Sequence, residues 1–224
     1  MHSGALRDTR RPGRGDGRLA PARPGIRTLS ASLSTASRGQ ALVEAARTLA
    51  PEIEAAAQRI EQDRQLPNEV VDALYAAGLF TMLLPASFGG AELDLPTFAR
   101  AIEELARADG SVAWCVGQAN GLCSYTAYAD PPTIRALFAN ERTIFANGPG
   151  EGNRPGRAVE AADGYRVTGR WMFASGIGHA SWLLAVCHVY APDGSPRLEA
   201  DGRHAQRLML LPKSSVTIHD VWQV

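Results

Sequence analysis

Residues 169–176 of this sequence, Gly-Arg-Trp-Met-Phe-Ala-Ser-Gly, combine side chains that could build a binding site for a flat molecule. If the segment is a strand, its bulky residues place an aromatic wall beside the small residues Ala174, Ser175 and Gly176. Small side chains let backbone N–H groups approach a ligand edge, and the Ser175 hydroxyl adds one more hydrogen-bonding group. This chemistry suits a planar ring with polar edges, such as a flavin. The alternative, from the residues alone, is an ordinary amphipathic strand that ends in a turn.

The other chemistry-bearing residues form no recognised motif. The glycine-rich stretch 148–152 is not followed by a helix pattern, so we expect a wide turn there and not a phosphate-binding loop. A Ser-His-Asp triad stays open, although the sequence has no Gly-x-Ser-x-Gly elbow. No pair of histidines has the i, i+4 spacing of a helical zinc site, so we predict no metal site. The histidines considered as metal ligands are His179, His188, His204 and His219.

The elements that must position these residues change character near Asn140. Before it, apolar residues recur every three or four positions, which is typical of amphipathic helices. Pro51 predicts a kink or a restart in the first helix. The segment 112–129 is apolar nearly all round and is expected to be the buried central helix. The predicted helices begin near Gln40, Pro67, Leu95, Val112 and Asp130.

After Arg142 the apolar residues alternate in short runs separated by glycines, which predicts β-strands with hairpin turns at residues 163–164 and 193–194. The fold class is therefore α+β and multidomain, with an N-terminal all-α helical domain over 39–140 and an incomplete β domain over 141–224. The predicted strands are 143–146, 157–161, 165–168, 170–175, 182–190, 207–211 and 216–221.

The charge of the 224-residue chain is unevenly distributed. The formal net charge is zero, which argues against non-specific nucleic-acid binding. Residues 1–38, however, hold eight arginines and two aspartates, whereas the remainder is acidic. We predict that residues 1–38 are a disordered basic tail, because they contain few large apolar side chains; a transit peptide is the alternative.

Three cysteines and the absence of a long apolar run indicate the compartment. Cys115 and Cys123 lie eight residues apart on one predicted helix, too far for a disulfide, so free thiols are expected. No apolar run approaches the roughly 20 residues of a membrane span. We therefore expect a cytoplasmic protein with no membrane and no nucleic-acid partner.

Several landmarks, taken in order, resemble the acyl-CoA dehydrogenase family. Residues 85–90, Pro-Ala-Ser-Phe-Gly-Gly, resemble its Pro-x-x-Tyr/Phe-Gly-Gly loop, and residues 102–111 resemble the end of its third helix. Residues 165–176 resemble its Gly-x-Lys-x-Trp/Phe-Ile-Thr/Ser flavin strand. None of these motifs is specific alone. The resemblance rests on their order, from about Leu42 to the end of the sequence.

The resemblance implies a helical domain, a β-barrel-like middle domain and a C-terminal helical bundle, with this chain truncated before the bundle. Phe173, Ala174 and Ser175 would face the ring of FAD, or of FMN, with Ser175 near the flavin N5 edge. The family carries Thr-Glu-Pro-x-x-Gly-Ser-Asp ahead of this strand. Here residues 147–152 read Asn-Gly-Pro-Gly-Glu-Gly, so Asn147 is only a positional candidate for a flavin contact.

The same resemblance places Trp114, Gln118 and Leu122 of the central helix in the substrate cavity. The family's catalytic base belongs to the C-terminal domain, so the base is expected beyond Val224 and no catalytic residue is named. The hydroxylases of the family often carry a substrate-binding histidine near the position of Leu122, and this sequence has none there.

The activity implied first is α,β-dehydrogenation of an acyl-CoA-type substrate, with hydride passed to flavin N5. The alternative is a two-component monooxygenase that uses reduced flavin on an aromatic or polycyclic substrate, because Arg-Trp-x-Phe-Ala-Ser-Gly over residues 170–176 looks more like that branch. A second alternative is an inactive remnant or interaction module. The implied partners are a small-molecule substrate such as an acyl-CoA, a flavin reductase or electron-transfer protein, and further copies of the chain in a homotetramer.

Overall fold

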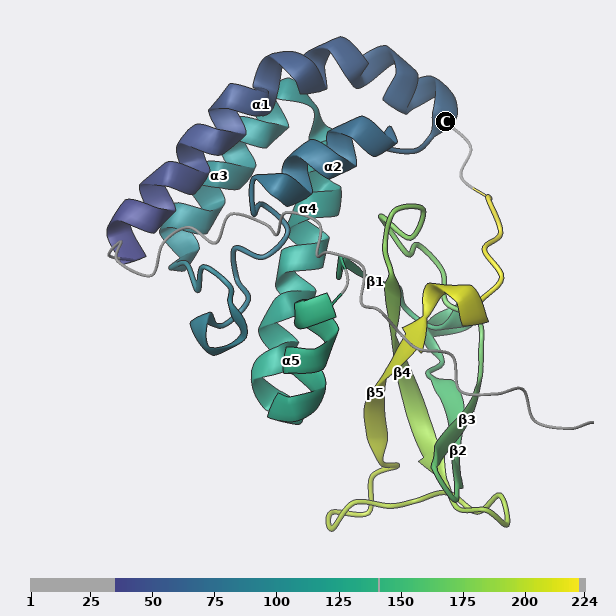
Figure 1. Ribbon diagram of the computed structural model, residues 1–224. Helices are drawn as coiled ribbons and strands as arrows, with labels where there is room; N and C mark the ends of the chain where they lie inside the picture. The colour runs from purple at the N-terminus through teal and green to yellow at the C-terminus, as the bar shows by residue number, and fades with distance from the viewer. Residues whose placement is uncertain (1–34, 141, 222–224) are drawn as a thin grey trace, which may run out of the picture.

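The computed structural model describes residues 35–140 and 142–221, and within them the helices come first along the chain and the strands follow. Figure 1 shows the helices packed together, with the sheet beside them. The predicted fold class, a helical domain followed by a β domain, is confirmed. Residues 1–34, most of the predicted tail, lie outside the described residues.

The first helix is longer than its apolar pattern. It begins at Thr35, ahead of Gln40 and inside the predicted tail, because small polar residues are favoured in a first helical turn. It also runs through Pro51 without a restart, and Figure 1 shows it bending along its length. The helices are α1 (Thr35–Asp63), α2 (Asn68–Ala76), α3 (Leu95–Ala108), α4 (Gly110–Cys123) and α5 (Pro131–Asn140).

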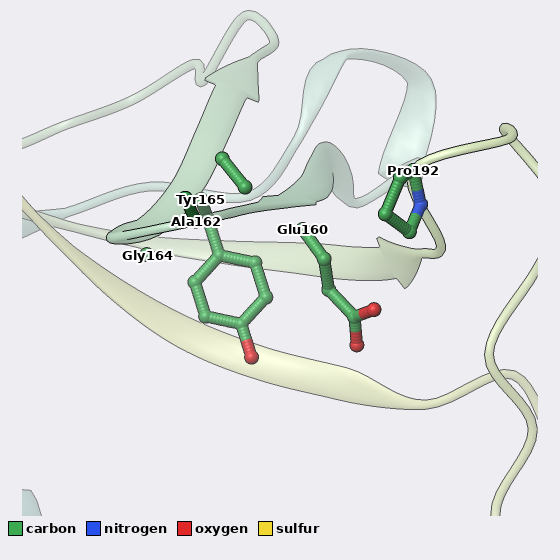
Figure 2. Close-up of a pocket in the computed structure, with 6 residues that line it drawn as sticks. Glu160, Ala162, Gly164, Tyr165 and Pro192 are labelled. Atoms are coloured by element: carbon green, nitrogen blue, oxygen red, sulfur yellow. The ribbon is translucent and has the colours of Figure 1, made fainter.

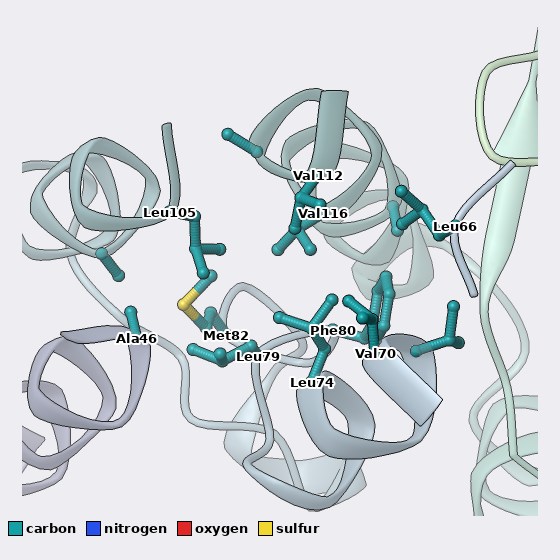
Figure 3. Close-up of a cluster of buried hydrophobic side chains, with 14 of the residues drawn as sticks. Ala46, Leu66, Val70, Leu74, Leu79, Phe80, Met82, Leu105, Val112 and Val116 are labelled. Carbon is teal, nitrogen blue, oxygen red and sulfur yellow. The ribbon is translucent and has the colours of Figure 1, made fainter. Parts of the chain in front are cut away.

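Helix α4 lies at the centre of the helical region, as predicted. It packs against α3 and against strand β1 (Phe145–Asn147), and it buries Val112 and Val116 among the large side chains shown in Figure 3. Its N-terminus is capped by Asp109, which accepts a hydrogen bond from the backbone N–H of Val112 at 2.8 Å. The α-helix ends at Cys123 and continues as a 3-10 turn, Ser124–Tyr128.

One buried amide ties α4 to the segment before α3. Asn120 has no exposed surface, and its Nδ2 donates to the carbonyl oxygens of Leu79 at 2.7 Å and Val116 at 2.9 Å. Its Oδ1 accepts from the backbone N–H of Leu83 at 3.1 Å. The bonds to Leu79 and Leu83 satisfy backbone groups that lie outside the helices and strands.

The sheet is organised around its longest strand, β4 (Trp182–Tyr190). Strands β1 and β2 (Gly156–Ala161) pair with β4 in parallel, one after the other along the same edge, at residues 182–184 and 187–190. Strand β5 (Gln206–Pro212) is antiparallel to β4 along the opposite edge. Strand β3 (Gly164–Thr168) forms the predicted hairpin with β2, and β1, β3 and β5 each pair with a single strand of the described sheet.

Two predicted strands are absent from the described sheet. Residues 170–175 form only an isolated bridge, Trp171 to Gly150, because Phe173 turns into the left-handed region at φ 53°. Residues 216–221 follow the 3-10 turn Lys213–Ser215 and pair with no strand in the described part of the chain. Both predictions were wrong because alternation of apolar residues gives no information about pairing partners.

The helical core continues into the sheet. Ile144, Ala146 and Ala180 are fully or almost fully buried, and they belong to the same apolar cluster as α1, α3 and α4. Strand β1 therefore packs on α4, with Ala146 in this cluster and Phe145 in a second cluster that contains Leu122 of α4. The boundary between residues 140 and 141 stays a prediction.

The three cysteines are free thiols, as predicted: Cys123 and Cys187 are buried and Cys115 is half-buried. Burial raises the pKa of the Cys123 thiol to about 12, and burial followed by the charge of Asp109 raises the pKa of Cys115 to about 11. Within residues 35–140 and 142–221, every helix is too short or too polar to cross a membrane.

Candidate functional site

The loop after β1, which begins at Gly148, lies against the segment 170–175. Met172 donates its backbone N–H to the carbonyl of Pro149 at 2.9 Å, and Glu151 donates to the carbonyl of Arg170 at 2.9 Å. The two backbones approach so closely that a Cβ on Gly148 would lie 1.9 Å from the Met172 carbonyl oxygen. Only glycine fits at position 148. Because Gly148 is in contact with Met172, the backbone of the preceding residue, Asn147, lies close to this segment.

Phe173 is held in a strained backbone conformation with its ring in solvent. Its φ of 53° is unfavourable for a residue with a Cβ, and 68% of the residue is exposed. A hydrogen bond from the backbone N–H of Ser175 to the Phe173 carbonyl, at 2.8 Å, closes the turn. The N–H of Ile177 donates to the carbonyl of Ala174 at 3.1 Å. Strain of this kind clusters at functional sites, where the surrounding structure maintains it.

Helix α4 supplies the second side of the site. The indole Nε1 of Trp114 donates to the hydroxyl oxygen of Ser175 at 2.9 Å, a bond between the helical region and the loop before β4. Trp114 is 60% exposed, so its ring, like that of Phe173, presents a large apolar face to solvent. Two exposed aromatic residues and the hydroxyl that hydrogen-bonds to one of them offer apolar and polar groups that a planar ligand can cover.

The other residues predicted for the site are placed unequally. Ala174 is half-buried against the sheet core, and Gln118 is half-buried one turn after Trp114 on α4. Leu122 is 4% exposed and packs in an apolar cluster with Leu84 and Phe145, so it offers little surface to a ligand. The structure thus joins Ser175 to Trp114 by a side-chain hydrogen bond and to Phe173 by a backbone hydrogen bond, and it leaves Leu122 in the core.

Behind Ser175 lies a histidine whose position the sequence did not reveal. His179 follows a turn in which Gly176 has φ 79°, and its Nε2 lies 3.0 Å from where a Cβ on Gly176 would be. Within the described residues this nitrogen is buried without a hydrogen-bond partner. Burial, followed by the charges of Lys213 and Arg142, lowers the pKa of His179 to about 4. The imidazole is therefore neutral at pH 7. The only local feature of the sequence that indicates its position next to this turn is Gly176, three residues earlier.

A hollow of about 620 Å³ lies elsewhere, at the β2–β3 hairpin (Figure 2). Glu160, Tyr165 and Pro192 line it, and the Glu160 carboxylate is paired with Arg197 at 2.5 Å. That hydrogen bond lowers the pKa of Glu160. Because its one carboxylate is already neutralised by an arginine and none of the residues predicted for the site lines it, this hollow is not the candidate site.

The geometry suits binding and orientation more than acid–base chemistry. Within the described residues, the side chains of Trp114 and Ser175 hydrogen-bond to each other and to no carboxylate or imidazole. The nearby His179 is neutral and faces the backbone of Gly176. No general base can be assigned in this part of the chain.

Comparison with known proteins gives a consistent family. The family model described as "Acyl-CoA dehydrogenase, N-terminal domain" matches residues 37–130. The oxygenase subunit HsaA, a flavin-dependent monooxygenase of Mycobacterium tuberculosis, is 32% identical over 189 residues, which are 83% of this chain and 44% of that protein. The oxygenase component of an FADH(2)-dependent resorcinol hydroxylase of a Rhizobium species is 31% identical over 75% of this chain and 39% of that protein.

Solved structures agree with the sequence relatives. XiaF from a Streptomyces species, in complex with FADH2 and glycerol, superposes with a TM-score of 0.75 at 26% identity, covering 85% of this chain and 46% of that chain. The HsaA monooxygenase of M. tuberculosis gives 0.72 at 30% identity, covering 83% and 48%. The chain spans less than half the length of the curated relatives it matches. The resemblance to the acyl-CoA dehydrogenase family that the sequence predicts is confirmed, since residues 37–130 match the model of that family's N-terminal domain.

Proposed function

We propose that this chain is part of the oxygenase component of a two-component flavin-dependent monooxygenase that acts on an aromatic small molecule. The proteins it resembles are described as flavin-dependent monooxygenases or hydroxylases, and the resemblance extends across both the helices and the sheet. A separate flavin reductase would supply the reduced flavin, in keeping with relatives described as oxygenase subunits or components.

The single observation that carries this proposal is the exposed surface formed by Trp114, Ser175 and Phe173. Its two aromatic faces and one hydroxyl match a planar ring with polar edges, so the residues present fit a flavin. Either FAD or FMN is compatible with them. When bound, a reduced flavin supplies the two electrons that activate molecular oxygen.

The chain's own residues would bind and orient. Phe173 would cover one part of the ring, and the Ser175 hydroxyl would hydrogen-bond at the N5 edge. Asn147, which precedes Gly148 in the chain, would offer an amide to the polar rim. Trp114 and Gln118 would face the substrate. The apolar rings would also exclude water from the reacting edge.

Dehydrogenation of an acyl-CoA, the activity implied first by the sequence, is not supported. The relatives described above are monooxygenases and hydroxylases, so the comparisons favour the alternative. The sequence departure at residues 147–152, where the dehydrogenase segment Thr-Glu-Pro-x-x-Gly-Ser-Asp is replaced, agrees with them.

The test measures flavin binding and oxygen transfer separately. The 224-residue chain is titrated anaerobically with photoreduced FAD and with FMN, and flavin fluorescence anisotropy gives the dissociation constants. Phe173→Ala should weaken binding about tenfold, because it removes a stacking face. Tyr165→Ala, which removes an exposed aromatic from β3, is the matched control and should leave binding unchanged.

Oxygen transfer is then tested with ¹⁸O₂, reduced flavin and a panel of phenols and indoles, with octanoyl-CoA as the competing substrate. One ¹⁸O atom in an aromatic product supports the proposal. Reduction of oxidised bound flavin by octanoyl-CoA, with no labelled product from the aromatic compounds, would overturn it.

A further inference from the structure

The hydroxyl of Ser175 is constrained by an unusual partner. The Trp114 indole N–H can only donate, and it points at the Ser175 oxygen at 2.9 Å. The two residues are 61 positions apart in sequence and belong to different regions of the fold. Among the described residues no other group hydrogen-bonds to this hydroxyl oxygen.

This bond limits what the hydroxyl can do. A serine hydroxyl has one hydrogen and two lone pairs, and Trp114 occupies one lone pair. The hydrogen must therefore point away from the indole, where it is available to another acceptor. The backbone N–H of Ser175 is already committed to the Phe173 carbonyl, so the hydroxyl is the donor that this residue has left to offer.

We propose that Trp114 is a positioning residue that fixes the rotation of the Ser175 hydroxyl, so that one hydrogen and one lone pair face the N5 edge of the flavin. This inference rests on the proposed function. The free hydrogen matches a ring nitrogen that accepts, and the free lone pair matches a ring N–H, so the fixed hydroxyl suits both redox forms of the ring. Without the indole donor the hydroxyl rotates freely or binds water, and the ring loses a preorganised partner.

The first arm of the test needs no flavin. In ¹H–¹⁵N spectra of the chain, Trp114→Phe identifies the Trp114 indole resonance by its loss. Ser175→Ala should shift that resonance and accelerate its exchange with solvent about three- to tenfold, the effect of losing one hydrogen bond. Ser175→Thr, which keeps a hydroxyl, should restore both. The indole resonance of Trp171, whose Nε1 donates to the Val186 carbonyl, is the internal control and should not move.

The second arm uses flavin labelled with ¹⁵N at N5. Trp114→Phe keeps an aromatic face at an exposed position, so it should not disturb folding, and thermal melting checks this. Trp114→Phe and Ser175→Ala should each weaken flavin binding about three- to tenfold and move the N5 resonance in the same direction. The double variant should bind flavin no more weakly than the single variant with the lower affinity, because both substitutions break the same Trp114–Ser175 hydrogen bond.

The outcomes separate this inference from the proposed function. Three results would overturn this inference and leave the proposed function standing. In the first, the Trp114 indole resonance does not move in Ser175→Ala. In the second, the N5 resonance moves in Ser175→Ala but not in Trp114→Phe. In the third, the loss of flavin affinity in the double variant is the product of the two single losses. A wild-type chain that binds neither FAD nor FMN overturns both proposals together.

Discussion

Lowering the pH from 7 to 5 should destabilise this protein through one buried imidazole, His179. Burial, with the charges of Lys213 and Arg142, lowers its pKa to about 4 in the folded chain, against an ordinary value of 6.5. Below pH 6.5 the unfolded chain therefore takes up a proton that the folded chain does not accept until about pH 4. Because the unfolded state binds more protons in that window, the free energy of unfolding falls as the pH falls.

The size of the effect follows from these two pKa values. The contribution is close to zero at pH 7, where both states are neutral at this residue. It reaches about 2 kcal/mol of lost stability at pH 5 and about 3 kcal/mol below pH 4, where it levels off. A loss of this size is a substantial part of the stability of an ordinary domain.

Urea unfolding followed by circular dichroism, at half-unit steps from pH 7 to pH 5, measures the loss in the wild type and in His179→Gln. The variant cannot titrate at this position, so its stability should fall by about 2 kcal/mol less over the range, whatever its stability at pH 7. Paired carboxylates contribute equally to both proteins and cancel in the difference. His219→Gln, at an exposed position, is the control and should follow the wild type. Curves for wild type and His179→Gln that stay parallel within about 0.5 kcal/mol would refute the reasoning.

Three further predictions use other features of the structure. Asn120→Ala should lower the free energy of unfolding by about 2–4 kcal/mol, because it leaves the Leu79 carbonyl and the Leu83 N–H without a partner. The control Gln118→Ala should lower it by less than about 1 kcal/mol, and equal losses in urea unfolding would contradict this prediction. Phe173→Gly should be more stable than Phe173→Ala by about 1 kcal/mol, because only glycine relieves the positive φ; an alanine variant at least as stable would show that the residue is not strained. Iodoacetamide at pH 8 should alkylate Cys123, whose pKa is about 12, at least about 100-fold more slowly in the folded chain than in urea. Mass spectrometry of the peptide that contains Cys123 measures the two rates, and equal rates would argue against the burial of this thiol.

Periodicity alone was enough to locate the helices, since burying one helix face requires an apolar residue at every third or fourth position. Helix α3 begins at Leu95 as predicted, and α4 is the buried central helix. The β2–β3 hairpin was equally clear, because residues 163–164 carry a specific turn signal. These features depend on neighbours in sequence.

The site was only partly predictable for the opposite reason. No local pattern indicates that residues 170–175 leave the strand conformation at Phe173, where they lie against Gly148, a residue distant in sequence. The family resemblance placed Trp114 on the central helix, but its hydrogen bond to Ser175 depends on how two regions pack. Leu122, predicted at the substrate cavity, lies about two turns after Trp114 on α4, and its side chain packs in the core.

Ile144, Ala146 and Ala180 share one apolar core with the helices, so we expect the helices and the sheet to unfold together. A chain cut at Asn140 would lose these side chains and expose the face of α4 that they cover, while the separated sheet would expose them in turn. Each half would then carry an apolar patch prone to aggregation. Heating the intact chain should therefore melt both regions in one transition, and the surface between Trp114 and Phe173 should be lost at the same temperature as the core.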